Sequence, residues 1–169
     1  NSSDFEALYI AGHLYQPLLY LNESAFKHQE IGKLIEVKPV ALNKGERDFV
    51  CDIQRFFDGN SPFFAGKALY LLRNKIRKGI GFFDDSGFYP DFIVWLVVGA
   101  HQYVSFIDPK GIPHLNGFSN SKVQLHKVIR EEIEPGLHDA NITLNSYILS
   151  KSELKNVKHW VDFSELDLT

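Results

Sequence analysis

A mixed α/β domain with one central sheet is the fold class that the sequence predicts, from three observations. Hydrophobic residues make up 44% and aromatic residues 14% of the 169 positions, enough apolar material for one packed core. One segment with helical spacing precedes a group of segments with strand character. A second helical segment separates this group from a further strand, and such an order is typical of a sheet covered by helices.

The first core helix is predicted over 42–59, "LNKGERDFVCDIQRFFDG". Asn43 is a good N-cap, and Glu46 follows three residues later, as in a capping box. The apolar residues after it recur at the spacing of one helix face: Phe49, Val50, Ile53, Phe56 and Phe57. Glu46 lies on the same side, so we expect it to point toward the sheet. Asp58 and Gly59 end the helix.

The central strands are predicted next along the chain. "KALYLLRN" forms a strand at 67–74, and "IGFF" is a candidate short strand at 80–83 after the basic turn "KIRKG". Two further strands cover about 88–98 and 102–108, joined by the short loop "GAHQ". If these two strands form an antiparallel hairpin, the start of the first faces the end of the second.

The remaining elements frame this hairpin. A helix is predicted over 119–136, beginning at Ser119 or Ser121 and ending at Pro135-Gly136. A strand, "ITLNSYILS", follows it, and a last helix is predicted over 150–161. Near the N-terminus, "LYQPLLYL" and "LIEVKPVAL" have extended character, and their prolines favour sheet edges or ends.

Composition narrows the function classes. The formal charge of −3 shows no global basic footprint, so any contact with a polyanion has to come from a local patch. One cysteine, Cys51, allows neither a disulfide within the chain nor a cysteine zinc site, which favours a cytoplasmic setting. No apolar run is long enough to cross a bilayer, so we expect no membrane association. The chain begins Asn-Ser-Ser, and we expect it to be excised from a larger multidomain protein.

Acidic residues gather at the predicted open end of the hairpin. Asp108 and Lys110 share one strand face because side chains alternate, and an antiparallel partner strand brings Asp91 close to Asp108. Glu46 from the first helix is expected at the same edge. Clustered carboxylates repel one another, and a hard divalent cation such as Mg²⁺ relieves that repulsion by accepting their oxygens. Metal-assisted phosphodiester hydrolysis is the reaction class that this pattern indicates.

Pro90-Asp91 followed by Asp108-Pro109-Lys110 resembles the PD-(D/E)xK motif of restriction-endonuclease-like nucleases. Both halves lie on successive predicted strands, and Glu46 is similar to the acidic residue that such nucleases often carry on the first core helix. The wider run over 40–111 resembles the C-terminal nuclease domain of type III-restriction-like and helicase-linked proteins.

The resemblance implies a single nuclease domain over 1–169, with a restriction-endonuclease-like αβββαβ core at about 34–160 around a central mixed sheet flanked by helices. It implies that Glu46, Asp91 and Asp108 bind Mg²⁺ or Mn²⁺, with the backbone carbonyl of Pro109 as a further ligand. It also implies that Lys110 assists the attacking water. The expected partners are DNA, a helicase or translocase domain of the same full-length protein, and a second copy of the chain.

The basic stretch after the first central strand is the candidate nucleic-acid-binding surface. Arg73, Lys75, Arg77 and Lys78 form either a solvated turn or a set of phosphate contacts. Asn74 is a candidate polar contact beside them.

Each of these residues also has a structural interpretation. Asp91 and Asp108 could end strands or shape turns, and Glu46 could act only in the capping box. Lys110 could extend to solvent from a strand end. The alternative functions are therefore a nucleic-acid-binding module that has lost catalysis and a protein-interaction domain.

Overall fold

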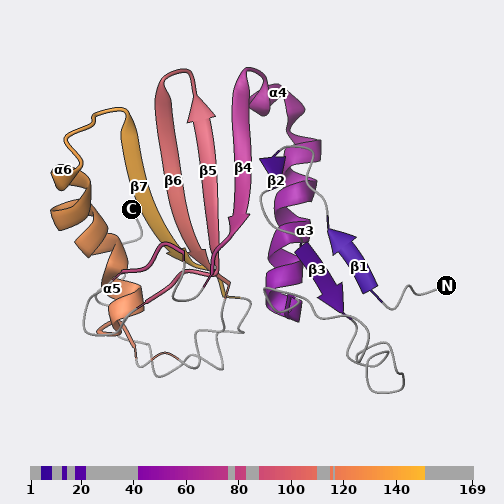
Figure 1. The fold of residues 1–169 in the computed structure, drawn as a ribbon, viewed down its shortest axis with the longest axis horizontal. Coiled ribbons are helices and arrows are strands. Elements are labelled where there is room, and N and C mark those ends of the chain that lie inside the picture. Colours follow the sequence, from indigo (N-terminus) through magenta and orange to yellow (C-terminus); the bar gives the residue numbers. More distant parts are fainter. Residues whose placement is uncertain are drawn as a thin grey trace.

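The computed structural model describes residues 42–75, 79–82, 88–109, 115 and 117–150, together with the backbone of three short strands nearer the N-terminus. The main sheet has the strand order β2-β4-β5-β6-β7, and β1 pairs with β3 in a separate two-stranded sheet (Figure 1). The strands are β1 (Phe5–Leu8), β2 (His13–Leu14), β3 (Leu18–Leu21), β4 (Lys67–Arg73), β5 (Phe92–Val98), β6 (His101–Asp108) and β7 (Ile142–Ile148). The helices are α3 (Lys44–Gly59), α4 (Ser61–Phe64), α5 (Ser121–Val128), the π-helical turn η2 (Ile129–Ile133) and α6 (Glu134–Gly136).

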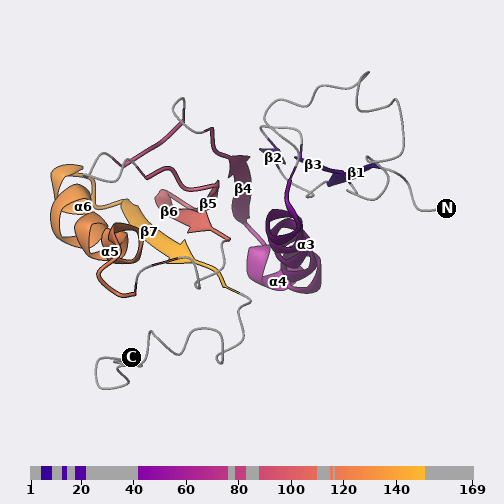
Figure 2. The ribbon, with the colours of Figure 1, turned by 90° about the horizontal axis from the view of Figure 1, so that it is seen from below.

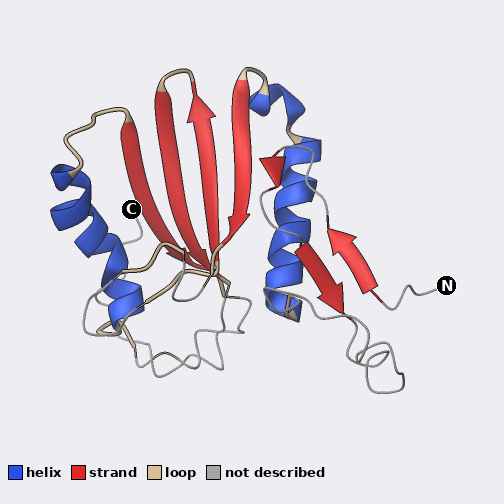
Figure 3. Ribbon diagram, viewed as in Figure 1, coloured by secondary structure: helices blue, strands red, loops and turns tan. Residues whose placement is uncertain are grey.

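The sheet is mixed. β4, β5 and β6 form an antiparallel meander, whereas β7 pairs parallel to β6 and β2 pairs parallel to β4. A parallel pair needs a crossover connection, and α5, η2 and α6 supply it between β6 and β7. The predicted mixed α/β class, with a central mixed sheet flanked by helices, is confirmed (Figure 3).

The helices cover both faces of the sheet. Phe92 of β5 and Ile107 of β6 pack with Phe49 and Val50 of α3. Their strand neighbours face the other way and form a second cluster with α5 and η2: Ile93, Phe106, Leu125 and Ile129. Because neighbouring residues of one strand alternate between faces, α3 and α5 lie on opposite sides of the sheet, as Figure 2 also shows.

The α3 helix begins where the sequence predicts. The Asn43 side chain accepts a hydrogen bond from the Glu46 amide at 2.9 Å, and Glu46 Oε2 accepts one from the Asn43 amide at 2.8 Å. The capping box is therefore confirmed. The predicted apolar face is confirmed only in part, because Phe56 is 56% exposed and its ring contacts Phe63 and Phe64 of the α4 segment rather than the sheet.

One predicted boundary is confirmed and one was wrong. The second long helix begins at Ser121, one of the two predicted starts, and its N-cap is Asn120, whose side chain accepts from the Lys122 amide at 3.0 Å. The strand predicted over about 88–98 is β5, which begins at Phe92 instead of residue 88, because Pro90 lacks the N–H that a strand ladder requires. The predicted helix at 150–161 lies outside the described residues.

The short strand expected at 80–83 is reduced to one isolated bridge, between Phe82 and Phe88. None of the described helices is long and apolar enough to cross a membrane.

We predict that Phe92→Ala lowers the free energy of unfolding by about 3–5 kcal/mol, because it removes a fully buried ring from the α3 side of the core. Phe56→Ala is the matched control, since that ring is 56% exposed, and it should lower the free energy far less. Chemical denaturation of both variants measures the difference. Equal losses in the two variants would contradict the packing described here.

Candidate functional site

The predicted site residues gather at one end of the sheet. β4 ends at Arg73, β5 starts at Phe92 and β6 ends at Asp108, and these three ends meet at the lower edge in Figure 1. The first turns of α3 and α5 lie at the same edge (Figure 1). Helix N-termini carry partial positive charge, which stabilises nearby carboxylates. The local field at this end therefore favours acidic side chains.

The register of the hairpin brings the two motif aspartates opposite each other. Phe92 pairs with Ile107, so positions 91 and 108 face one another one step beyond the paired residues. The Asp91 carbonyl accepts from the Asn74 amide at 2.9 Å, and the Asp108 carbonyl accepts from the Leu149 amide at 3.0 Å. Neighbouring segments on both sides thus hold the two backbones in place. Asp91 lies directly before β5, one residue past the last pair of the ladder, so the continued register brings it to the same end of the hairpin as Asp108.

Asp108 is a buried carboxylate with a lysine beside it. Its exposed fraction is 2%, and its Oδ2 lies 3.5 Å from the ammonium of Lys122 in the first turn of α5. The side chain shares a strand face with Phe106, which packs under α5. A buried charge without a counter-charge is strongly unfavourable, and Lys122 supplies a counter-charge to Asp108.

Glu46 is paired with an arginine on the α3 side. Its Oε2 lies 3.4 Å from a guanidinium nitrogen of Arg73, at the end of β4, and both side chains are largely buried. Burial lowers the pKa of Arg73, whereas the negative charges of Glu46 and Asp91 raise it. Because the pKa of arginine starts so far above neutral, Arg73 stays charged at pH 7. Asp91 is therefore close enough to act on the same cation as Glu46.

The start of α3 lies against the backbone of Pro109. A Cβ at Gly45 would stand 3.1 Å from the Pro109 carbonyl oxygen and 3.3 Å from Asn43 Oδ1. The absence of a side chain at this position lets the first turn of α3 approach the carbonyl that the sequence predicts as a metal ligand. Glycine is needed here for close approach, not for backbone conformation.

The three carboxylates reach this end of the sheet from different sides. Glu46 comes from α3, and Asp108 points toward α5 on the opposite face. Within the described part of the chain, no group of three or more His, Cys, Asp and Glu side chains is placed to hold a metal ion. The predicted convergence therefore brings the acidic residues to one edge without joining all three in a single cluster.

The donor set at this edge suits a hard cation. Asp91, Asp108 and the Pro109 carbonyl offer oxygen ligands, and Mg²⁺ is commonly held by one or two carboxylates with water in its other positions. Glu46 fits less well, because its oxygen already accepts from the Asn43 amide and the Arg73 guanidinium.

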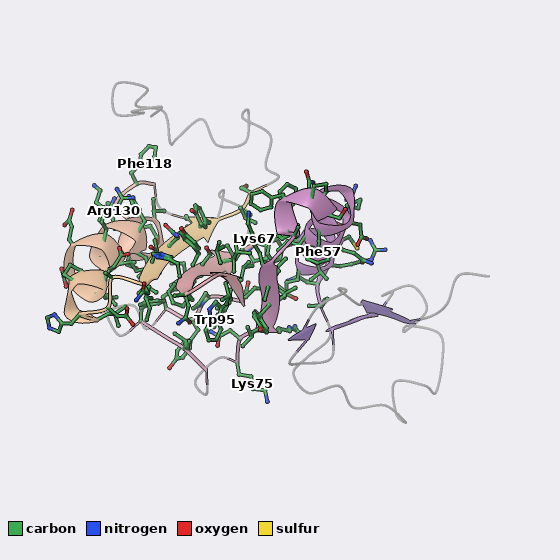
Figure 4. All side chains as sticks on the ribbon, turned by 90° about the horizontal axis from the view of Figure 1, so that it is seen from above. Phe57, Lys67, Lys75, Trp95, Phe118 and Arg130 are labelled. Atoms are coloured by element: carbon green, nitrogen blue, oxygen red, sulfur yellow. The ribbon has the colours of Figure 1, made fainter. Side chains whose placement is uncertain are left out.

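The predicted nucleic-acid contacts divide into two groups. The side chain of Asn74 holds its loop together. Its Nδ2 donates to the carbonyls of Ile80 at 2.7 Å and Pro90 at 2.9 Å, and its Oδ1 accepts from the backbone N–H of Ile80 at 3.0 Å. Lys75 is exposed and extends away from the sheet (Figure 4). Arg77 and Lys78 lie outside the described residues, as does Lys110.

Arg73 and Lys122 are the residues whose place at this edge the sequence analysis missed. Leu69, Leu71 and Arg73 alternate along β4 onto one buried face, so strand periodicity could have indicated that Arg73 is buried. Lys122 stands in the first turn of a helix with no acidic residue there, an unfavourable place for a cation. That mismatch was the available signal for a nearby negative charge.

We predict that Arg73→Gln lowers the free energy of unfolding by about 3–5 kcal/mol, because it leaves the Glu46 carboxylate buried without its cation. Arg55→Gln is the control: its ion pair with Asp52 is exposed, and such pairs contribute about 0–1 kcal/mol. Adding Glu46→Gln, which keeps a capping-box side chain, should restore part of the loss. Denaturant titration measures all three, and an Arg73→Gln loss no larger than that of Arg55→Gln would refute the pairing.

The chain matches no family model, no curated protein and no solved structure.

Proposed function

We propose that this domain hydrolyses phosphodiester bonds of nucleic acid, with DNA as the expected substrate, at a Mg²⁺-dependent site. The observation that carries the proposal is the β5–β6 register, which sets Asp91 across from Asp108 at a sheet end flanked by two helix N-termini. The order of helix, three strands, helix and strand from α3 to β7 supports a restriction-endonuclease-like core.

Each residue would have its own role in metal binding or catalysis. Asp91 and Asp108 would supply carboxylate oxygens to the metal, and Pro109 would supply its backbone carbonyl. A bound Mg²⁺ or Mn²⁺ would polarise the phosphate and lower the pKa of a bound water. Lys110, two residues after Asp108, orients the attacking water or neutralises charge that develops on the phosphate. Glu46 would add a third carboxylate only after leaving the Arg73 guanidinium, from which its Oε2 lies 3.4 Å.

The substrate would extend along the basic stretch at the end of β4. Lys75 is exposed there, and the sequence adds Arg77 and Lys78, so phosphates can bind by charge alone. Arg73 would hold Glu46 rather than DNA, and Asn74 would hold the loop that presents Lys75. A helicase or translocase domain in the same full-length protein, and pairing of two copies, belong to this proposal through the sequence resemblance over 40–111 alone.

One observation favours a second candidate, a non-catalytic nucleic-acid-binding or interaction module of the same fold. Arg73 and Lys122 already balance Glu46 and Asp108, so internal ion pairs suffice to explain why these acidic side chains are buried. A module of this kind would bind DNA through its basic stretch without cutting it.

Plasmid cleavage separates the two candidates. With Mg²⁺ or Mn²⁺, the wild-type chain should nick or cut plasmid DNA, and excess chelator should stop it. Asp108→Ala and Lys110→Ala should each lower the rate at least about 100-fold, because they remove a metal ligand and the cation at the reacting phosphate.

Asp58→Ala serves as the control, since Asp58 is exposed near the far end of α3, away from the site (Figure 1). Its rate should match that of the wild-type chain. Metal-independent cutting would reject the Mg²⁺-dependent site. Absent cutting by the wild-type chain, together with DNA binding in a gel-shift experiment, would reject the nuclease and support the binding module.

A further inference from the structure

We infer that Lys122 is the resident counter-ion of Asp108 and that a divalent metal entering the site has to compete with it. The inference rests on the proposed function, because it concerns the metal of that same site. It makes Lys122 a positioning residue that sets metal affinity, acting through Asp108 rather than on the substrate.

The contact geometry is the first argument. The Lys122 ammonium lies 3.5 Å from Asp108 Oδ2, and Asp108 is 2% exposed. Unit charges this close interact far more strongly in a protein environment than in bulk water. A metal bound by the same carboxylate would stand close to this ammonium, so the two cations would repel each other.

The position of Lys122 in its helix is the second argument. It follows the Asn120 cap by two residues, and its amide donates to the Asn120 side chain at 3.0 Å. The partial positive charge of the helix N-terminus disfavours a lysine at this position. The negative charge of Asp108 offsets that unfavourable field. The contact with Asp108 therefore accounts for a lysine in the first turn of the helix, which the helix alone does not favour.

The surroundings of Lys122 allow it to leave. Its ammonium lies over the Phe88 ring, 4.8 Å from the ring centre, and makes a cation–π contact there. Its side chain is nevertheless 28% exposed, in contrast to that of Asp108. A long, partly exposed lysine can turn to solvent when a metal neutralises its partner, whereas the buried aspartate stays in place.

Two substitutions should move metal affinity in opposite directions. Lys122→Gln removes the competing charge, so Mn²⁺ should bind at least about threefold more tightly than to the wild-type chain. Lys122→Arg keeps the charge and offers a fork that fits a carboxylate better, so Mn²⁺ should bind more weakly. Lys127→Gln, an exposed lysine of the same helix, should leave the affinity unchanged. Calorimetric titration with Mn²⁺, without nucleic acid, measures all four proteins.

A metal-free measurement tests the ion pair itself. In chelator, Lys122→Gln should lower the melting temperature, and adding Asp108→Asn should recover part of it, because the buried charge has then been removed. Lys122→Arg retains the positive charge, so it keeps the affinity test available if Lys122→Gln does not fold.

The outcomes separate the inference from the proposed function. Mn²⁺ binding that is equal in the wild-type chain and both Lys122 variants overturns the inference and leaves the nuclease proposal standing. No Mn²⁺ binding by the wild-type chain overturns both. The predicted affinity order without any plasmid cleavage supports the counter-ion and counts against catalysis.

Discussion

The antiparallel register of β5 and β6 is the constraint on which the rest of this structure depends. With Phe92 opposite Ile107, the two strands direct alternate side chains into the α3 and α5 cores, and they leave positions 91 and 108 facing each other at one end. A shift of one residue would move every side chain of a strand to the other face. The large apolar residues on both faces therefore fix the place of the aspartates as firmly as they fix the core.

Charge balance is the second organising feature of this end of the sheet. Glu46 and Asp108 are nearly as buried as the apolar core, and each has a cation from a neighbouring element, Arg73 of β4 or Lys122 of α5. Removing one partner of a buried ion pair lowers the free energy of unfolding more than replacing both partners with apolar residues. The same two pairs bear on the proposed metal site, because a metal would have to share the carboxylate oxygens of Glu46 and Asp108 with Arg73 and Lys122.

Most of the fold could be predicted from the sequence, because its signals are local. The Asn43–Glu46 capping box and the alternation within β4, β5 and β6 depend on neighbouring residues, and the hairpin follows from them. The faces from which Glu46 and Asp108 approach the edge could not be predicted with the same ease, since they depend on which helix covers which face. The contacts of Arg73 and Lys122 join segments far apart in sequence, and only the packed structure brings them together. The role of Asn74 in holding its loop could not be predicted either, because it depends on a hydrogen bond to the distant Pro90 carbonyl.

The central claim is that the acidic end of the β5–β6 hairpin holds a divalent metal. A crystal of the chain grown with Mn²⁺, with data collected for the anomalous signal of manganese, tests it most directly. We expect a peak between the carboxylates of Asp91 and Asp108, within ligand distance of the Pro109 carbonyl oxygen, with Lys122 turned away from Asp108. Intact Asp108–Lys122 and Glu46–Arg73 pairs, with no peak at this edge at saturating Mn²⁺, would contradict it.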